Sequence, residues 1–153
     1  MSSWNDSIHF CNWIGVTCSP SSKQVMVLNL IAKKFSGSIP PSIGNLTYLT
    51  GINLDNNSFY GEIPQEVGHL QHLQHLNLTW DSFGGKLPTN LSHCTQLKML
   101  HASHNDLTRE ILDHLSSLSK LVNLQLGCQQ PHRKYPCLDW KLFFFAYSYS
   151  CSE

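Results

Sequence analysis

Residues 49–64 read L-T-G-I-N-L-D-N-N-S-F-Y-G-E-I-P, and the spacing of the apolar residues in this stretch recurs every 24 residues. Apolar side chains fill seven columns of the repeat, at positions 1, 4, 6, 11, 15, 19 and 22. A single unit of this kind cannot bury its apolar face alone, whereas stacked units share one core. The register therefore predicts a solenoid of four full repeats and one partial repeat, which begin at Val25, Leu49, Leu73, Leu97 and Leu121.

The first part of each repeat alternates apolar and polar residues, which is typical of a short strand with one buried face. Every repeat enters its strand in the same direction, so neighbouring strands should be parallel. We expect one strand within each of the ranges 27–31, 51–55, 75–79, 99–103 and 123–126.

The second part of each repeat should contain a tight bend and a short helical turn. Gly37, Gly61 and Gly85 suit a backbone bend, and the proline three residues after each glycine stops regular helix. An asparagine at position 9 should hydrogen-bond the turn backbone, and Asn57 and Asn105 supply it. Lys33 and Asp81 occupy the same position in the other repeats. We call this column of position-9 side chains the ladder; only two of its four members are asparagine.

These residues resemble the plant-type leucine-rich repeat, L-x-x-L-x-x-L-x-L-x-x-N-x-L-x-G-x-I-P, over residues 1–126. The stretch from Phe10 to Cys18 is similar to the end of the N-terminal cap of plant receptor-like kinases and receptor-like proteins. The resemblance implies a Cys11–Cys18 disulfide, with Trp13 covering the first repeat. It also implies an α/β-type right-handed solenoid, with a short parallel sheet on the concave face and turns and 3-10 segments on the convex side. The sequence opens without a signal peptide or cap helix, so we expect it to begin inside a cap.

Three segments follow from this pattern: a partial cap at 1–24, the repeats at 25–126 and a non-repeat tail at 127–153. Repeat four departs from the pattern at Arg109 and Leu112. Cys128 and Cys137 are either a second cap pair or part of an unrelated tail. The last repeat should be unsealed and should fray first, because nothing recognisable covers Leu121, Leu124 and Leu126.

Composition excludes several classes of function. The 153 residues carry 10 basic and 10 acidic side chains, so the net charge is zero and a nucleic-acid partner is not expected. No apolar run approaches the roughly 20 residues of a membrane span. The kinase motifs G-x-G-x-x-G, V-A-I-K, H-R-D and D-F-G do not occur. We predict a non-enzymatic protein without cofactor or metal: His75, His101 and His104 should be solvated, and Cys94 should be a buried apolar residue.

The concave face is the expected binding surface, since its polar lane includes an exposed tryptophan, a residue type enriched where binding energy concentrates. The resemblance implies a peptide or protein ligand, a co-receptor as a further candidate partner, and an extracellular or plasma-membrane-associated location. Alternatives are a polygalacturonase-inhibitor-like protein and a non-functional truncated gene product. The candidate contact residues are Asn53, Asp55, Asn77, Thr79, Trp80, His101, Ser103 and His104.

Asn-x-Ser/Thr sequons occur five times, which fits a secreted lineage. Asn45 and Asn90 fall on the outer turns and are the expected glycan acceptors. Asn77 lies in a predicted strand on the concave face, where a glycan would block binding.

Overall fold

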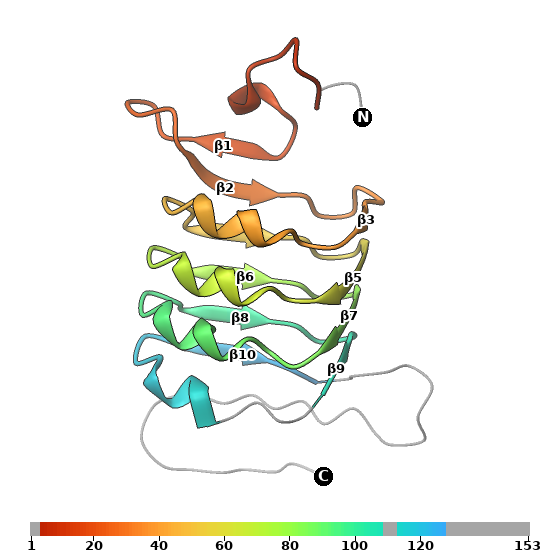
Figure 1. The fold of residues 1–153 in the computed structure, drawn as a ribbon, viewed down its shortest axis with the longest axis vertical. Helices are drawn as coiled ribbons and strands as arrows, with labels where there is room; N and C mark the ends of the chain where they lie inside the picture. Colours follow the sequence, from red (N-terminus) through yellow and green to blue (C-terminus); the bar gives the residue numbers. More distant parts are fainter. Residues whose placement is uncertain (1–3, 109–112, 128–153) are drawn as a thin grey trace.

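The chain winds into a coil that makes one turn per repeat, so that equivalent residues of successive repeats lie one above the other (Figure 1). The computed structural model describes residues 4–108 and 113–127. Arg109, Leu112, the Cys128–Cys137 pair and the tail therefore lie outside the described residues.

The first sheet has six strands in the order β1-β2-β4-β6-β8-β10. From β2 onward each strand pairs in parallel with the next, as predicted. Each predicted strand is present, although it ends slightly before the end of its predicted range. The cap adds one antiparallel strand, β1, that the sequence did not indicate. The bounds are Val16–Cys18, Val25–Asn29, Gly51–Asn53, His75–Asn77, Met99–His101 and Asn123–Gln125.

A second parallel sheet, in the order β3-β5-β7-β9, lies where the sequence predicted bends alone. The bend is real, since Gly61 has φ +81° and Gly85 has φ +73°. Because the repeats stack in register, the extended residues around these glycines also face their equivalents in the next repeat and pair with them. The strands are Ser36–Gly37, Ser58–Glu62, Ser82–Gly85 and Asp106–Leu107.

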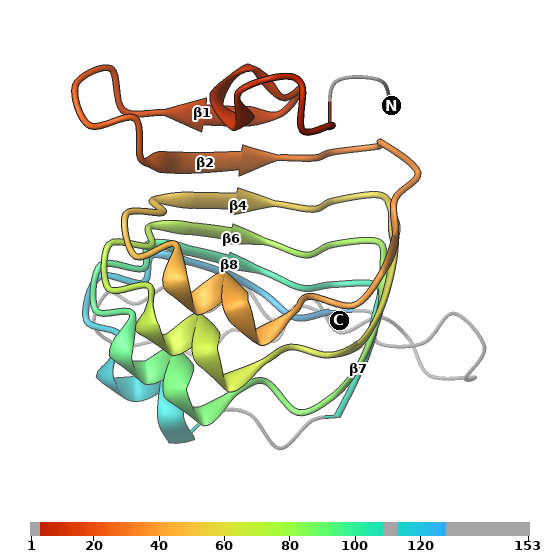
Figure 2. The same ribbon diagram turned by 45° about the horizontal axis from the view of Figure 1, so that its top comes forward.

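Short 3-10 helices line the convex side, as predicted (Figure 2). Three of them start directly after Pro40, Pro64 and Pro88. They pack closely: a Cβ added at Gly68 would lie 2.3 Å from the backbone oxygen of Asn90 in the next helix. The small residue at this position therefore sets how near the repeats approach. These convex-side helices are η2 (Pro41–Asn45), η3 (Gln65–His69), η4 (Thr89–His93) and η5 (Asp113–Ser117), whereas η1 (Phe10–Asn12) lies in the cap.

The apolar columns form one continuous core, in which Phe59 and Phe83 stack with ring centroids 6.2 Å apart. Phe83 is fully buried. The prediction that Leu121 and Leu124 are uncovered is wrong, since each is 1% exposed. That this end of the coil frays first stays a prediction. Leu126 is half-buried.

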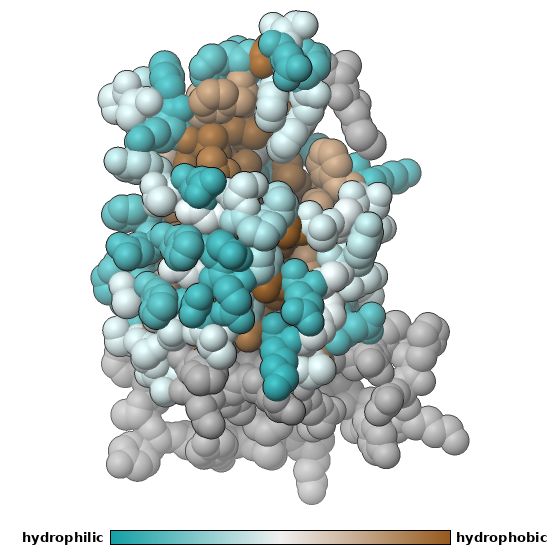
Figure 3. All heavy atoms as spheres, in the orientation of Figure 1, coloured by the Kyte–Doolittle hydropathy of each residue, from teal (hydrophilic) through white to brown (hydrophobic). Residues whose placement is uncertain are grey.

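The partly exposed end of the core lies in repeat one instead. Apolar surface beside the cap is visible near the top of Figure 3. Most of the equivalent residues of repeats two to four are buried, because each of those repeats has a neighbour on both sides. The half-buried members of repeat one are Val25, Leu28, Phe35, Ile39, Ile43 and Leu46.

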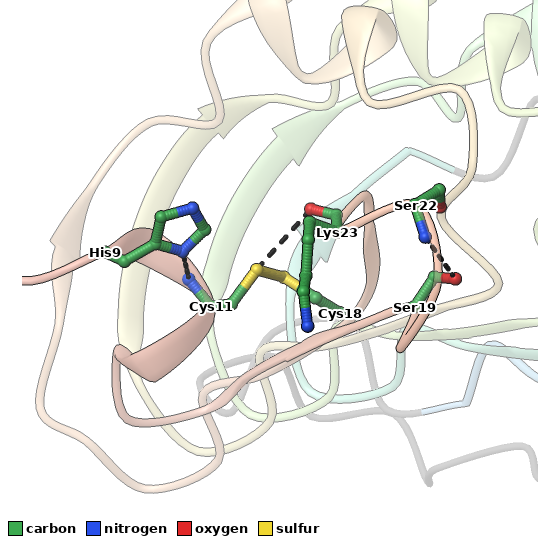
Figure 4. The surroundings of a disulfide bond; sticks show 6 residues. All are labelled: His9, Cys11, Cys18, Ser19, Ser22 and Lys23. Carbon is green, nitrogen blue, oxygen red and sulfur yellow. Dashed lines mark hydrogen bonds between the residues drawn. A yellow bond between two sulfur atoms is a disulfide. The ribbon is translucent and has the colours of Figure 1, made fainter.

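The cap is held by the predicted disulfide, since Cys11 and Cys18 are bonded with their Cα atoms 5.5 Å apart. The carbonyl oxygen of Lys23 lies 3.5 Å from the Cys11 sulfur, and the Cys11 N–H donates to Nδ1 of His9 (Figure 4). Gly15 joins the cap to repeat one: its φ is +88°, and a Cβ there would lie 2.3 Å from the Asn29 oxygen.

Aromatic stacking also links the cap to repeat one, and it involves Trp4 in addition to the expected Trp13. Trp4 stacks on Trp13 at 4.8 Å between centroids and meets Phe35 of repeat one at 5.9 Å. Trp13 therefore reaches the ring of Phe35 through Trp4 rather than directly. The indole N–H of Trp4 donates to the Ile14 carbonyl, and that of Trp13 to the Ile8 carbonyl.

Loss of the disulfide should loosen the cap. The bond closes a short loop, so Cys11→Ser with Cys18→Ser should lower the stability of the cap by about 2–3 kcal/mol. We expect hydrogen exchange of the β1 and β2 amides to accelerate, with β6 unaffected. Ser21→Ala, an exposed change in the same hairpin, is the control. Unchanged protection of β2 in the double variant would contradict a structural role for the bond.

Candidate functional site

Three positions of each repeat build the concave face, on the first sheet and just beyond the carboxyl ends of its strands. Positions 5 and 7 alternate with the buried leucines and face outward, because successive side chains of an extended chain point to opposite sides. Position 8 follows the strand. In repeats two to four these residues are Asn53, Asp55 and Asn56; Asn77, Thr79 and Trp80; His101, Ser103 and His104.

The asparagines of position 5 bond their own repeat. The carboxamide oxygen of Asn53 accepts from the Asp55 N–H at 3.2 Å, and that of Asn77 accepts from the Thr79 N–H at 3.1 Å. Each carboxamide is thereby fixed in direction. Its NH2 group, a donor, is the part that remains for a ligand.

Position 8 has a left-handed backbone in repeats one to four, although none of its residues is glycine. The φ angles are 52° at Ala32, 59° at Asn56, 56° at Trp80 and 56° at His104. Such angles are uncommon for bulky side chains, so the coil imposes them and gives these side chains a fixed exit direction.

Trp80 and His104 form a flat aromatic pair at this position. Their ring centroids are 3.6 Å apart and their planes differ by 13°. Trp80 is nevertheless 57% exposed, because the histidine covers one face of the indole only. The structure therefore presents the predicted aromatic contact residue on a supported, solvent-facing platform.

Polar atoms without partners gather around this platform. Asp55 Oδ1, Asp81 Oδ2, His101 Nε2 and His104 Nδ1 are buried and accept or donate no hydrogen bond among the described residues. Buried polar atoms are ordinarily paired, so these atoms mark where water or a ligand group would bind. Ser103 is itself buried, and its side chain contributes little to the surface.

Asp81 is the site residue that sequence reasoning missed, since it registered only as a failed asparagine. Its Oδ1 accepts from the Phe59 N–H at 2.8 Å, as the Asn105 oxygen does from the Phe83 N–H. Burial raises the pKa of Asp81 from 3.8 to about 7, with the charge of Asp55 adding to the rise and the Phe59 hydrogen bond opposing it. The sequence signal that could have identified Asp81 was a carboxylate at position 9, where two other repeats place an asparagine that bonds the backbone.

Two other candidates have no reactive geometry. Burial raises the pKa of the Cys94 thiol to about 12, and its Sγ lies 3.3 Å from the Val67 oxygen, so it is a poor nucleophile. In residues 4–108 and 113–127, no group of three or more His, Cys, Asp or Glu side chains could hold a metal ion. The same residues include no helix long and apolar enough to cross a membrane.

The sequon asparagines differ in exposure. Asn45 ends η2 and is exposed. Asn90 on η4 is half-buried, and its Cβ lies against Gly68. Glycosylation at both remains a prediction, and Asn45 is the more accessible of the two.

Matches to two family models show which family the chain belongs to. The model of the leucine-rich repeat region matches residues 15–136, and that of the leucine-rich repeat N-terminal domain matches residues 1–19. The chain belongs to the leucine-rich repeat family. Both matches describe repeats and cap, and neither describes a catalytic domain.

Known relatives of this leucine-rich repeat chain are plant receptors. It is 54% identical over 54 residues to the LRR receptor-like serine/threonine-protein kinase EFR of Arabidopsis thaliana, a match that covers 35% of this chain and 5% of the kinase. The chain thus spans a small part of the length of the curated relatives it matches, and the kinase domain of those relatives is not covered.

Solved structures give the same result. The ectodomain of BIR2 from Arabidopsis thaliana superposes with a TM-score of 0.76 at 30% identity, over 82% of this chain and 68% of that one. A second neighbour is the ectodomain of the receptor kinase GASSHO1/SCHENGEN3 from the same plant, in complex with CASPARIAN STRIP INTEGRITY FACTOR 2. It superposes with a TM-score of 0.78 at 32% identity, over 80% of this chain and 15% of that one. These neighbours confirm the predicted solenoid.

Proposed function

We propose that this leucine-rich repeat chain is a non-enzymatic recognition module of a plant receptor, located outside the cell, and that it binds a peptide or protein on its concave face. The observation that carries the proposal is the Trp80–His104 platform, in which a 57%-exposed indole is held rigidly within a polar lane. Rigid exposed aromatics lose little entropy on binding and contribute large contact areas.

The surrounding groups suit a polypeptide partner. Asn53 and Asn77 offer directed NH2 donors to peptide carbonyls, and Asp55 offers a carboxylate to N–H or cationic groups. The carboxylates of Asp55 and Asp81 lie close enough for one charge to raise the pKa of the other. A ligand with a basic residue near the indole would therefore gain from both Coulomb attraction and cation–π contact.

The printed descriptions of the neighbours support the class of partner. One neighbour is a receptor ectodomain in complex with CASPARIAN STRIP INTEGRITY FACTOR 2, and another is the BIR3–SERK2 complex. The first concerns a receptor with a separate factor and the second a pair of proteins. By analogy we propose a peptide or protein ligand for this chain, and a co-receptor as a second partner.

Trp80→Ala tests the site. Peptides would be selected on the full chain from a displayed random library, and their affinities measured by titration calorimetry. We expect Trp80→Ala to weaken binding about 30-fold or more, since loss of a buried aromatic contact costs roughly 2 kcal/mol. Tyr60→Ala, which removes a ring of equal exposure from β5 in the second sheet, should change affinity less than about 2-fold. Equal effects of the two variants would overturn the proposal.

A further inference from the structure

A shallow groove of about 850 Å³ lies at the opposite end of the strands from Trp80. Its lining residues lie around the starts of β2, β4, β6 and β8. These strand starts are on the left in Figure 1. The cap hairpin closes one end through Ser19 and Ser22, and the loop before β8 forms the other end at Thr95. The groove thus crosses several repeats and is separate from the concave lane.

The lining of the groove is mostly polar and uncharged, with two lysine ammonium groups at its margin. Four glutamines line it, and none of its lining residues is Asp, Glu, Lys or Arg. Each glutamine carries two donors and one acceptor oxygen. Two of the four are fixed from outside the groove: Gln74 Oε1 accepts from Lys98 Nζ at 2.9 Å, and Gln96 Oε1 accepts from Lys120 Nζ. Their NH2 groups are therefore oriented donors.

An aromatic pair interrupts this polar lining. Tyr48 is 51% exposed, and its ring stacks on that of His72 with centroids 6.1 Å apart and planes 20° from parallel. The tyrosine ring thus faces a ring of the neighbouring repeat. An exposed ring among hydrogen-bonding amides offers an apolar surface and polar groups to the same ligand.

The backbone along this edge is already paired between repeats. The N–H of Thr50 donates to the Met26 oxygen, that of Gln74 to Thr50, and that of Lys98 to Gln74, each at 2.8 Å. A peptide therefore finds no free main chain to extend as a strand. The lining itself contains no Lys or Arg, and the nearby ammonium groups of Lys98 and Lys120 already donate to Gln74 and Gln96. Phosphates, uronates and nucleic acids, which are bound through direct contacts to cations, are therefore disfavoured.

We propose that this groove binds a neutral oligosaccharide. The hydroxyls of a sugar both donate and accept, which matches the glutamine side chains, and the C–H face of a sugar ring would pack on Tyr48. Because the lining continues from one repeat to the next, the groove suits a linear chain of sugars rather than one monosaccharide. The proposal is independent of the peptide site, which lies at the other end of the strands.

Titration of the full chain with cellohexaose, xylohexaose, mannohexaose and hexagalacturonate, followed by saturation-transfer NMR and calorimetry, tests this inference. We expect at least one neutral hexasaccharide to bind and the anionic one not to bind. Tyr48→Ala should weaken binding at least about tenfold, whereas Tyr48→Phe, which keeps the ring, should stay within about threefold. Tyr60→Ala and Trp80→Ala should have no effect. Circular dichroism of each variant checks that the fold is kept.

Several results would overturn the assignment. They are binding of hexagalacturonate alone, no binding of any neutral hexasaccharide, an unaltered affinity in a folded Tyr48→Ala variant, or an equal loss in Trp80→Ala. Loss of peptide binding in Trp80→Ala with sugar binding kept would support both sites separately.

Discussion

Asp81→Asn should raise the free energy of unfolding by about 2 kcal/mol at pH 8 and leave it nearly unchanged at pH 4. In the neighbouring ladder positions, the Asn57 amide donates to the Leu30 carbonyl and the Asn105 amide to the Leu78 carbonyl. Ionised Asp81 has no proton for the equivalent bond, and its Oδ2 is buried without a partner. Asparagine at position 81 would complete the ladder.

The sign follows from the direction of the pKa shift. The pKa of Asp81 rises from 3.8 to about 7 in the folded chain, mainly through burial and also through the charge of Asp55. Below pH 3.8 the carboxyl is mostly protonated in both states, so folding carries little penalty. As the pH rises from 4 to 7 the unfolded chain loses its proton first, and the stability falls until it levels off above pH 7. Such a shift corresponds to on the order of 4 kcal/mol for a shielded group, and partial exposure of Asp81 reduces the expected effect to about 2.

Urea unfolding of the full chain at intervals between pH 4 and pH 8 measures this effect. Asp106→Asn, an exposed change on β9, is the matched control and should leave the pH profile unaltered. A parallel pH profile for wild type and Asp81→Asn would show that Asp81 ionises normally in the folded chain.

Asn105→Ala should destabilise the chain by about 4 kcal/mol, the largest loss expected of a single polar substitution here. The Asn105 side chain is 2% exposed. Its NH2 group donates to the Leu78, Ala102 and Ser103 carbonyls at 2.7, 3.2 and 3.2 Å, and its oxygen accepts from the Phe83 N–H at 2.9 Å. Alanine would remove the partners of the Leu78 carbonyl and the Phe83 N–H, at roughly 1–3 kcal/mol for each group that water cannot reach.

Two companion variants locate the cause. Asn57→Ala removes the same ladder contacts from a half-buried site, so its loss should be smaller. Asn105→Asp keeps the oxygen that accepts from Phe83 but cannot donate when ionised, so its loss should grow between pH 4 and pH 8. Chemical unfolding of the three variants, side by side, checks the order. A loss below about 1 kcal/mol for Asn105→Ala would refute the ladder as a source of stability.

The sequence by itself determined the coil. Seven apolar columns with a 24-residue period require stacked repeats, and the alternation around Ile52 and Leu76 requires parallel strands with those residues inside. Pro40, Pro64 and Pro88 determined where the 3-10 helices start. The Cys11–Cys18 pair followed from resemblance to a cap, and the structure contains it.

Contacts between repeats decided the rest. The strands around Gly61 and Gly85 have no alternation that marks them; they form because equivalent backbone groups meet in the next repeat. The exposure of Trp80 could be predicted from its column, but its stacking on His104 depends on a residue 24 positions later. The glutamine-lined groove and the raised pKa of Asp81 likewise depend on side chains of neighbouring repeats. The environment of a side chain in a solenoid is set by residues one repeat away. The local sequence pattern does not tell how close those residues lie or how much water they exclude from the side chain.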